Sequence, residues 1–264
     1  MECKIFKLCF LTFLMEELLI GVDDAGRGPV LGPMCLAGVL IRKSEEKELK
    51  EIGARDSKLL TSEHRERIVG KLKEKCLAFK TILVSPREID TGFDKGLNLN
   101  EVEAYACAEI INELTARITS EQRKGLKIIL DCPSINTTSW KKQLLDYVRE
   151  KSLSEKIVCE HKADFNFVVV SAASIIAKTT RDAEIEKLKE KFGIDFGSGY
   201  PSDPVTVEFL KKNATNTRFK GLFRESWSSW QNASGIKSNF YRKSYGLPEP
   251  NSSNKNKQKS LGEF

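Results

Sequence analysis

Short apolar runs alternate along the chain with segments in which apolar residues recur at the spacing of a helix. The apolar runs predict buried strands at residues 18–20, 30–41, 78–85, 127–132 and 156–160. The helical spacing predicts helices over residues 44–52, 61–76, 99–118, 137–151, 168–192 and 204–213. Strands and helices that alternate in this way are typical of an α/β domain.

The first apolar run leads directly into two adjacent acidic residues. Asp23 and Asp24 lie in the stretch GVDDAGRGP. Side chains alternate along a strand, but a strand end that runs into glycines can relax the alternation and bring both carboxylates to one site. Neighbouring carboxylates repel each other, and a divalent metal ion with oxygen ligands would neutralise them. The alternative is an acidic strand end in a solvated turn.

The turn after these acids combines two small residues with a positive charge. Because they lack a Cβ atom, Gly26 and Gly28 let the backbone approach a ligand closely. Arg27, between them, would supply charge to that ligand. The turn is therefore a candidate ligand-binding loop.

Other polar residues later in the chain are candidates for the same site. Asp131 ends the apolar strand KIILDC, and strand ends are where α/β sheets tend to carry site residues. The two histidines, His64 and His161, stand far apart in the sequence, so a zinc site is not expected. Asp182 has charged neighbours within a predicted helix, and we interpret it as part of a solvated helix face.

Composition narrows the class of protein without identifying it. With 264 residues, the chain can form one domain with appendages. The net charge of the chain is +6. Residues 237–264 contain six Lys or Arg and two Glu, so they carry +4 of this charge and the rest of the chain carries only +2. The overall charge therefore gives weak support for a nucleic-acid partner. Seven scattered cysteines without a C-x-x-C pair indicate buried reduced thiols. No G-K-[ST] follows a glycine loop, which disfavours a P-loop ATPase.

The first fifteen residues, MECKIFKLCFLTFLM, are apolar but lack the features of an export signal. No small-residue cleavage site follows them, and the run is too short to span a bilayer. Met15 lies just before the first strand, so we interpret residues 1–14 as a non-native or mis-started extension. We therefore expect a cytoplasmic protein that does not bind a membrane.

Five blocks of the sequence together resemble the ribonuclease HII family, the type 2 ribonucleases H of archaea, bacteria and eukaryotes. They occur in the family's order across roughly residues 18–230. One position departs from the pattern, because the family usually carries Glu where this chain has Asp24. The blocks are GVDDAGRGPVLGPM (21–34), RDSKLL (55–60), ILDCP (129–133), HKADFNFVVVSAASIIAKTTRD (161–182) and GSGYPSDP (197–204).

The resemblance implies a ribonuclease H-like domain over residues 15–236, with a mixed sheet flanked by helices and a helical C-terminal segment. It implies an endoribonuclease that hydrolyses the RNA strand of RNA–DNA hybrids and cuts 5′ to single ribonucleotides embedded in duplex DNA. Two Mg²⁺ or Mn²⁺ ions would support in-line attack by water, leaving 5′-phosphate and 3′-hydroxyl ends. The residues that match the family's metal-binding, catalytic acids are Asp23, Asp24, Asp131 and Asp164.

The same resemblance assigns residues to substrate binding. The backbone of Gly26, Arg27 and Gly28, together with Tyr200, would hold the ribose whose 2′-hydroxyl separates RNA from DNA. For Tyr200 the alternative is a buried core tyrosine with a satisfied hydroxyl. Lys58 would contact a substrate phosphate, or Asp56-Ser57-Lys58 would simply cap local structure.

The C-terminal residues differ in composition from the rest of the chain. Residues 237–257 are predicted to form a basic flexible linker. Residues 258–264 resemble the box by which replication and repair proteins bind the sliding clamp, although the box usually ends in two aromatics and this chain has one. The matching positions are Gln258, Leu261 and Phe264. Because this motif is self-contained, we expect an archaeal-style monomer.

Two other functions remain open from the sequence. Asp24 is one methylene shorter than the usual Glu, and a ligand displaced by roughly 1 Å can cost on the order of a hundredfold in rate. The chain could then be a catalytically weakened hybrid-binding protein recruited by the clamp, or an enzyme with a changed metal preference. Another ribonuclease H-like nuclease, such as a junction resolvase or integrase, would not need Tyr200 to read a ribose.

Overall fold

The computed structural model describes residues 16–54 and 61–237, which fall into two compact units. Within the described residues, unit 1 takes in residues 16–27, 34–54, 61–83 and 100–184, and unit 2 takes in residues 28–33, 84–99 and 185–237. The predicted N-terminal extension and clamp motif lie outside the described residues, as do Lys58 and all but the first residue of the predicted linker.

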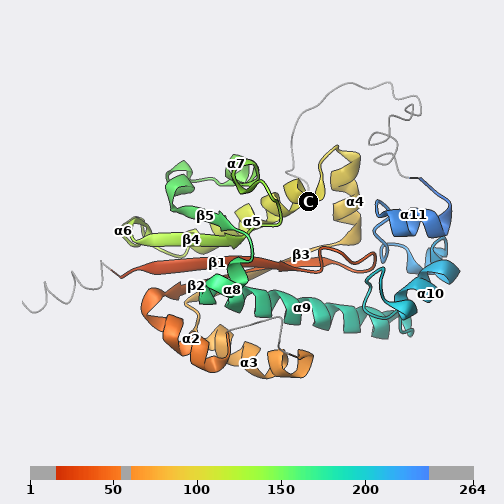
Figure 1. The fold of residues 1–264 in the computed structure, drawn as a ribbon, viewed down its shortest axis with the longest axis horizontal. Helices are drawn as coiled ribbons and strands as arrows, with labels where there is room; N and C mark the ends of the chain where they lie inside the picture. Colours follow the sequence, from red (N-terminus) through yellow and green to blue (C-terminus); the bar gives the residue numbers. More distant parts are fainter. Residues whose placement is uncertain (1–15, 55–60, 238–264) are drawn as a thin grey trace, which may run out of the picture. The chain divides into compact units, whose positions relative to one another are not determined.

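Unit 1 is built on a mixed sheet of five strands, which confirms the expected fold class (Figure 1). The strand order is β3-β2-β1-β4-β5, with β1 antiparallel to β2 and parallel to β4, and with β4 parallel to β5. The strands are β1 (Leu18–Ala25), β2 (Met34–Arg42), β3 (Ala78–Val84), β4 (Leu126–Asp131) and β5 (Ile157–Glu160).

Helices cover both faces of this sheet (Figure 1). On one face, α2 (Glu46–Ile52), α3 (Ser62–Lys75) and the first part of α9 (Val168–Phe192) pack on the sheet through an apolar cluster. On the other face lies α5 (Leu99–Thr115). Unit 1 also contains η1 (Lys43–Glu45), α6 (Ser120–Lys124), α7 (Thr137–Tyr147), η2 (Lys151–Lys156) and α8 (Ala163–Asn166).

Two glycines allow the helices to approach the central strands closely. A side chain on Gly21 of β1 would collide with the backbone of Val169 at the start of α9. A side chain on Gly38 of β2 would collide with Ile110 of α5. These contacts show which helix covers each face of the strands: α9 lies over the face of Gly21, and α5 lies over the face of Gly38.

Unit 2 has its own apolar core. Its elements are α4 (Pro86–Asp94), the end of α9, α10 (Pro204–Asn213), η3 (Thr217–Phe219) and α11 (Ser228–Ser234). Two residues of the loop 28–33, Val30 and Leu31, are fully buried in this core, and Leu31 forms a bridge to Phe223. The rest of the core is rich in aromatic residues, among them Phe196, Phe209, Phe219 and Trp230.

Several element boundaries differ from the sequence prediction. The second strand begins at Met34, because Val30 and Leu31 belong to the core of unit 2. Residues 86–94, for which no helix was predicted, form α4; Ser85 and Glu88 make a capping box around Pro86. The helix predicted to reach residue 118 ends at Thr115, and the helix predicted to reach residue 151 ends at Tyr147.

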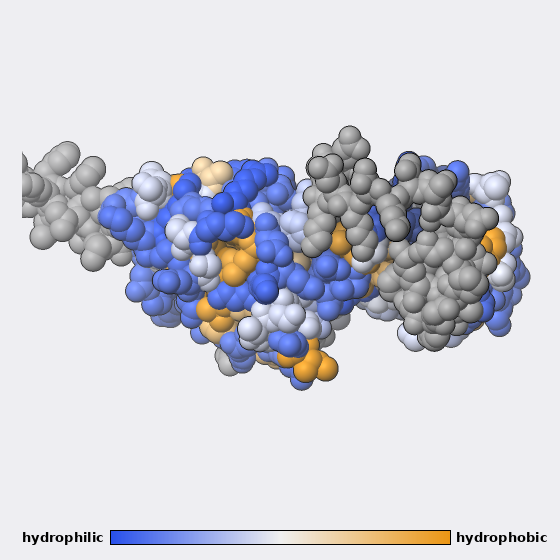
Figure 2. All heavy atoms as spheres, turned by 90° about the horizontal axis from the view of Figure 1, so that it is seen from above, coloured by the Kyte–Doolittle hydropathy of each residue, from blue (hydrophilic) through white to orange (hydrophobic). Residues whose placement is uncertain are grey.

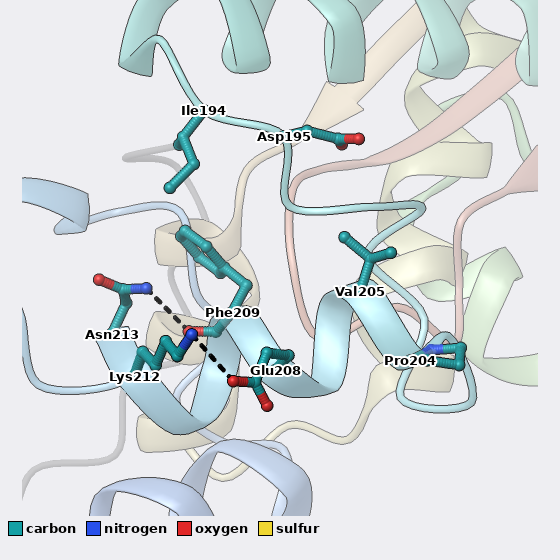
Figure 3. Close-up of a pocket in the computed structure, with 8 residues that line it drawn as sticks. All are labelled: Ile194, Asp195, Pro204, Val205, Glu208, Phe209, Lys212 and Asn213. Atoms are coloured by element: carbon teal, nitrogen blue, oxygen red, sulfur yellow. Dashed lines mark hydrogen bonds and ion pairs between the residues drawn. The ribbon is translucent and has the colours of Figure 1, made fainter.

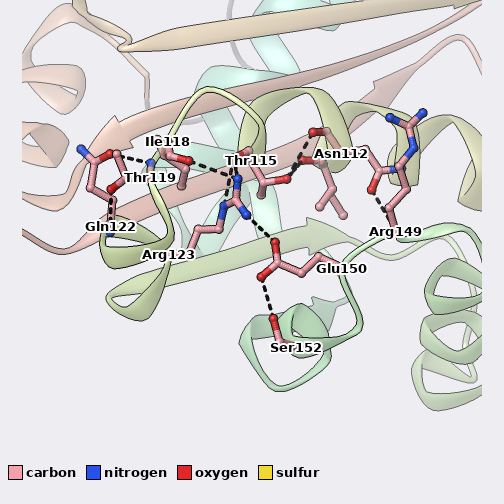
Figure 4. A network of polar contacts seen from close by, with 10 residues as sticks. Asn112, Thr115, Ile118, Thr119, Gln122, Arg123, Arg149, Glu150 and Ser152 are labelled. Atoms are coloured by element: carbon pink, nitrogen blue, oxygen red, sulfur yellow. Dashed lines mark hydrogen bonds and ion pairs between the residues drawn. The ribbon is translucent and has the colours of Figure 1, made fainter.

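An arginine network closes the C-terminal end of α5 (Figure 4). Arg123 donates to the Thr115 carbonyl oxygen at 2.8 and 3.1 Å and to that of Ile118 at 3.2 Å. Its guanidinium also forms an ion pair with Glu150 at 2.6 Å. Thr119 caps the following helix α6 by accepting from the backbone N–H of Gln122 at 3.2 Å. The carbonyl groups at the end of α5 are therefore satisfied by a side chain.

Of the described cysteines, Cys35, Cys107 and Cys132 are buried as expected, whereas Cys76 and Cys159 are half-buried. The face shown in Figure 2 is mainly hydrophilic with small apolar patches. None of the helices within the described residues is long and apolar enough to cross a membrane. The described cysteines, at positions 35, 76, 107, 132 and 159, are all free thiols.

Candidate active site

Three predicted acids of unit 1 lie on the side of the sheet where the parallel strands β1 and β4 end. Asp23 lies on β1 and Asp131 ends the neighbouring strand β4. The Ala163 N–H donates to Asp131 Oδ1 at 2.8 Å, which ties the start of α8 to the end of β4. Asp164, the next residue, is 5% exposed and Asp23 is 6% exposed. Asp23, Asp131 and Asp164 are thus carried by elements joined side by side.

The electrostatics of Asp23 show that these carboxylates act on one another. Burial raises the pKa of Asp23 well above its ordinary value, and the negative charges of Asp24 and Asp131 raise it further. Hydrogen bonds from the Ser174 hydroxyl and the Asp24 N–H work in the opposite direction. The fully buried Ser174 in turn accepts from the ammonium group of Lys178 at 2.9 Å. Additional positive charge would therefore stabilise ionised Asp23.

The expected relaxation of strand alternation at Asp23 and Asp24 does not occur. Regular pairing with β2 continues through Ala25, with Asp23 opposite Ala37 and Asp24 opposite Leu36. Asp23 lies on the α9 face, in agreement with its hydrogen bond from Ser174. Asp24, the next residue of the regularly paired strand, lies on the α5 face. The two carboxylates leave β1 on opposite sides.

The four predicted acids have the oxygen ligands that a divalent metal ion needs, but their present arrangement does not form a metal site. Within residues 16–54 and 61–237, no group of three or more His, Cys, Asp or Glu side chains is arranged to hold a metal ion. Carboxylate oxygens are nevertheless the ligands that Mg²⁺ and Mn²⁺ prefer, and the mutual repulsion at Asp23 is what a cation relieves. Holding an ion would require side-chain rotation that brings the carboxylates together.

Arg27 forms an ion pair with a buried acid that the sequence analysis did not single out. Its guanidinium pairs with Glu103 and donates to the Asn100 side-chain oxygen, both on α5. The Glu103 side chain is 1% exposed and that of Arg27 is 31% exposed. Burial lowers the pKa of Arg27. Much of the Arg27 charge is therefore compensated within unit 1. The sequence did contain a sign that Glu103 is buried, because it stands between Val102 and Ala104 in an apolar part of the helix.

In unit 2, the predicted ribose-contacting residues Gly28 and Tyr200 lie against each other. A Cβ atom on Gly28 would stand 3.5 Å from Cε1 of the Tyr200 ring. The Val30 N–H donates to the Gly199 carbonyl oxygen at 2.8 Å, which joins the two loops. Tyr200 is 39% exposed, so it is not a buried core tyrosine. Its face is accessible to a ligand.

The loop that carries Tyr200 is held by Asp203. The Asp203 carboxylate accepts from the Ser198 N–H at 2.6 Å, the Ser198 hydroxyl at 2.7 Å and the Val205 N–H at 3.0 Å. The bonds from Ser198 are the main cause that lowers the pKa of Asp203 to about 2. The same carboxylate caps α10. The Asp203 carboxylate is therefore ionised at neutral pH and accepts these hydrogen bonds.

A separate pocket of about 430 Å³ in unit 2 contains none of the predicted site residues (Figure 3). Polar groups around it are paired, with Lys212 to Glu208 at 2.9 Å and Asn213 Nδ2 to the Phe209 carbonyl oxygen at 3.0 Å. Asp182, the acid interpreted as part of a helix face, forms an ion pair with Arg65 at 2.7 Å in unit 1. Neither feature extends the acidic site.

Comparison with known proteins supplies the family. The sequence model of the family Ribonuclease HII matches residues 20–230. A ribonuclease HII of Methanococcus maripaludis strain C7 is 40% identical over 217 residues, which cover 82% of this chain and 87% of the relative. Among solved structures, the ribonuclease H2 of Pyrococcus horikoshii OT3 has a TM-score of 0.71 and 36% identity, covering 83% of this chain and 97% of that one. A chain in the PCNA:RNase HII complex from Archaeoglobus fulgidus has a TM-score of 0.69 and 36% identity. The match covers 84% of this chain and 98% of that one.

The mixed sheet with acids at the ends of β1 and β4 defines a ribonuclease H-like nuclease. The chain belongs to the ribonuclease HII family and is a ribonuclease H, a hydrolase. Family membership removes the junction resolvase and integrase alternative.

Proposed function

We propose that this ribonuclease hydrolyses the RNA strand of RNA–DNA hybrids and cuts 5′ to single ribonucleotides embedded in duplex DNA. The observation that carries the proposal is the position of Asp23 on β1 and of Asp131 at the end of its parallel neighbour β4, in a chain of this family. Such a set can bind a cation that in turn binds a phosphodiester. The expected products have 5′-phosphate and 3′-hydroxyl ends.

The proposed mechanism assigns the acids to metal binding. Asp23, Asp24, Asp131 and Asp164 would hold two Mg²⁺ or Mn²⁺ ions. When bound, such ions supply activation of the attacking water and stabilisation of the leaving oxygen. Asp131 is positioned by the Ala163 N–H and Asp23 by the Ser174 hydroxyl. These bonds hold the two carboxylates in the metal-free chain, from which they would rotate to bind an ion.

Ribose recognition is proposed for the turn and the tyrosine. The Gly26, Arg27 and Gly28 backbone and the Tyr200 side chain would contact the ribose of the ribonucleotide. The contact between Gly28 and Tyr200 in unit 2 and the exposure of the Tyr200 ring support this proposal. The Arg27 ion pair with Glu103 supports a role for Arg27 in holding the turn. Lys58, proposed to contact a phosphate, is outside the described residues.

The position of Asp24 favours a second candidate function. Asp24 leaves β1 on the face opposite Asp23, so its carboxylate must reach past the strand to share an ion with Asp23. The Asp side chain is short for that distance. The chain could then be a weakened enzyme that mainly binds hybrids. The usual Glu would extend the reach by one methylene.

Cleavage of a DNA duplex that contains one ribonucleotide tests both candidates. We expect a cut 5′ to the ribonucleotide with Mg²⁺ or Mn²⁺, lost in Asp131→Asn, and accelerated up to about a hundredfold in Asp24→Glu. An unchanged rate in Asp24→Glu would show that the site already accommodates Asp24. If neither this chain nor Asp24→Glu cuts with either ion, the binding-protein function is the one that remains.

We also propose that the C-terminal motif binds a sliding clamp. The similar chain from Archaeoglobus fulgidus was solved as a complex with PCNA, which is consistent with this partner. Deletion of residues 258–264 is expected to abolish pull-down by the clamp while cleavage of short duplexes stays unchanged. Pull-down that survives the deletion would remove Gln258, Leu261 and Phe264 as the docking residues. The cytoplasmic location and the monomeric state remain predictions.

A further inference from the structure

The carbonyl group of Gly28 accepts a hydrogen bond from a tryptophan that the proposed function does not use. The indole Nε1–H of Trp227 donates to the Gly28 carbonyl oxygen at 3.2 Å, and both residues belong to unit 2. Gly28 is exposed and has no side chain, so only its backbone groups can hold it in place. A hydrogen bond to its carbonyl group fixes the plane of the peptide that follows.

The indole ring of Trp227 is itself held on two sides. The guanidinium carbon of Arg224 lies 4.9 Å from the centre of the ring, a cation–π arrangement. Phe93 meets the ring edge to face, with centroids 5.8 Å apart and planes at 67°. The ring therefore has little freedom to rotate its N–H away from Gly28.

Arg224 connects this support to the loop that follows Gly28. Arg224 is fully buried, its backbone N–H donates to the Val30 carbonyl oxygen at 2.9 Å, and its Nε donates to that of Gly32 at 3.1 Å. Residues 28–32 are thus held by three donors from residues 224–227. The same loop lies against the Gly199–Tyr200 segment through Val30.

We propose that Trp227 is a positioning residue for ribose recognition: its indole N–H holds the Gly28 backbone at the distance from Tyr200 that a ribose with a 2′-hydroxyl requires. This inference rests on the proposed function. A backbone that reads a single hydroxyl must be ordered before binding, because a mobile glycine would lose affinity to the entropy of ordering. Trp227 acts through Gly28 and does not touch the substrate in this scheme.

The matched variants are Trp227→Phe and Trp230→Phe. Trp230 donates its indole N–H to the Ala214 carbonyl oxygen at 3.0 Å and is 5% exposed, so it loses an equivalent bond without any link to Gly28. Binding is measured in the uncleaving Asp131→Asn background, with a duplex containing one ribonucleotide and with the same duplex in all-DNA form. The readout is the ratio of the two dissociation constants, together with the melting temperature of each variant.

We expect Trp227→Phe to lower the preference for the ribonucleotide about three- to tenfold, the value of one lost hydrogen bond, while all-DNA binding and the melting temperature change little. Trp227→His, which can restore a ring N–H donor, is expected to recover part of the preference. Trp230→Phe is expected to lower the melting temperature and leave the preference unchanged.

Two results would overturn the inference while leaving the proposed function intact. One is an unchanged preference in Trp227→Phe, and the other is an equal loss in Trp227→Phe and Trp230→Phe. If the parent background binds both duplexes equally, ribose recognition itself is absent and the proposed function fails with the inference.

Discussion

Asp23→Asn is expected to reduce cleavage by about a thousandfold or more while raising the melting temperature of the metal-free protein. The loss of activity follows because a bound divalent ion contributes several kcal/mol to such reactions and Asp23 is one of its proposed ligands. The gain in stability follows because burial and the charges of Asp24 and Asp131 disfavour ionised Asp23 in the folded chain. Steady-state cleavage and thermal melting of the same preparation measure both effects.

Asp182→Asn is the control for this experiment. Asp182 is an aspartate of unit 1 on α9, but its side chain is 36% exposed and paired with Arg65. Its replacement is expected to leave cleavage unchanged and to lower the melting temperature slightly. Cleavage by Asp23→Asn within a few fold of the parent would exclude Asp23 from the metal site.

Arg27→Met is expected to destabilise the protein by about 3–5 kcal/mol, because it leaves the Glu103 carboxylate buried without its ion-pair partner. Glu103→Gln should cost less, since the Arg27 side chain is 31% exposed and remains hydrated. The double variant Arg27→Met/Glu103→Leu should recover much of the loss, because it leaves no buried charge. Denaturant unfolding of the parent, Arg27→Met, Glu103→Leu and the double variant gives the coupling energy of the pair.

The comparison for this series is an exposed ion pair. Lys47 and Glu51 lie 3.9 Å apart with side chains 88% and 66% exposed. Lys47→Met is expected to change the unfolding free energy by less than about 0.5 kcal/mol. Equal effects of Arg27→Met and Lys47→Met would show that the Arg27–Glu103 pair is not a structural anchor.

Sequence patterns predicted the bounds of several elements closely. The strands β4 and β5 and the helices α9 and α10 were placed within a residue or two. The start of β2 was misplaced because Val30 and Leu31 are apolar but belong to the core of unit 2. A local pattern shows that a residue is buried, yet it does not show in which core. The helices α4 and α6 were missed despite local signals, a capping box around Pro86 and another between Thr119 and Gln122.

Some residues of the candidate site could likewise be predicted from the sequence, and others could not. Asp131 was recognisable because an acid at the end of an apolar strand is unusual, and the family resemblance added Asp164. Glu103 was not recognised, because its partner Arg27 is 76 positions away and only the fold brings them together. The opposite orientation of Asp23 and Asp24 depends on how far the pairing of β1 continues, which the glycines after it left undetermined.

Free cysteines at three positions, of which Cys35 is buried and Cys76 and Cys159 are half-buried, can report the unfolding of the chain. Burial is the main cause that raises the pKa of the Cys35, Cys76 and Cys159 thiols to about 12. At neutral pH only about one such thiol in 100,000 is then ionised, and the thiolate is the form that alkylating reagents attack. Alkylation of these thiols should therefore be slow in the folded chain and rapid once it opens. The alkylation rate of these thiols would therefore report differences in unfolding free energy among the variants, and no probe would have to be attached to the protein.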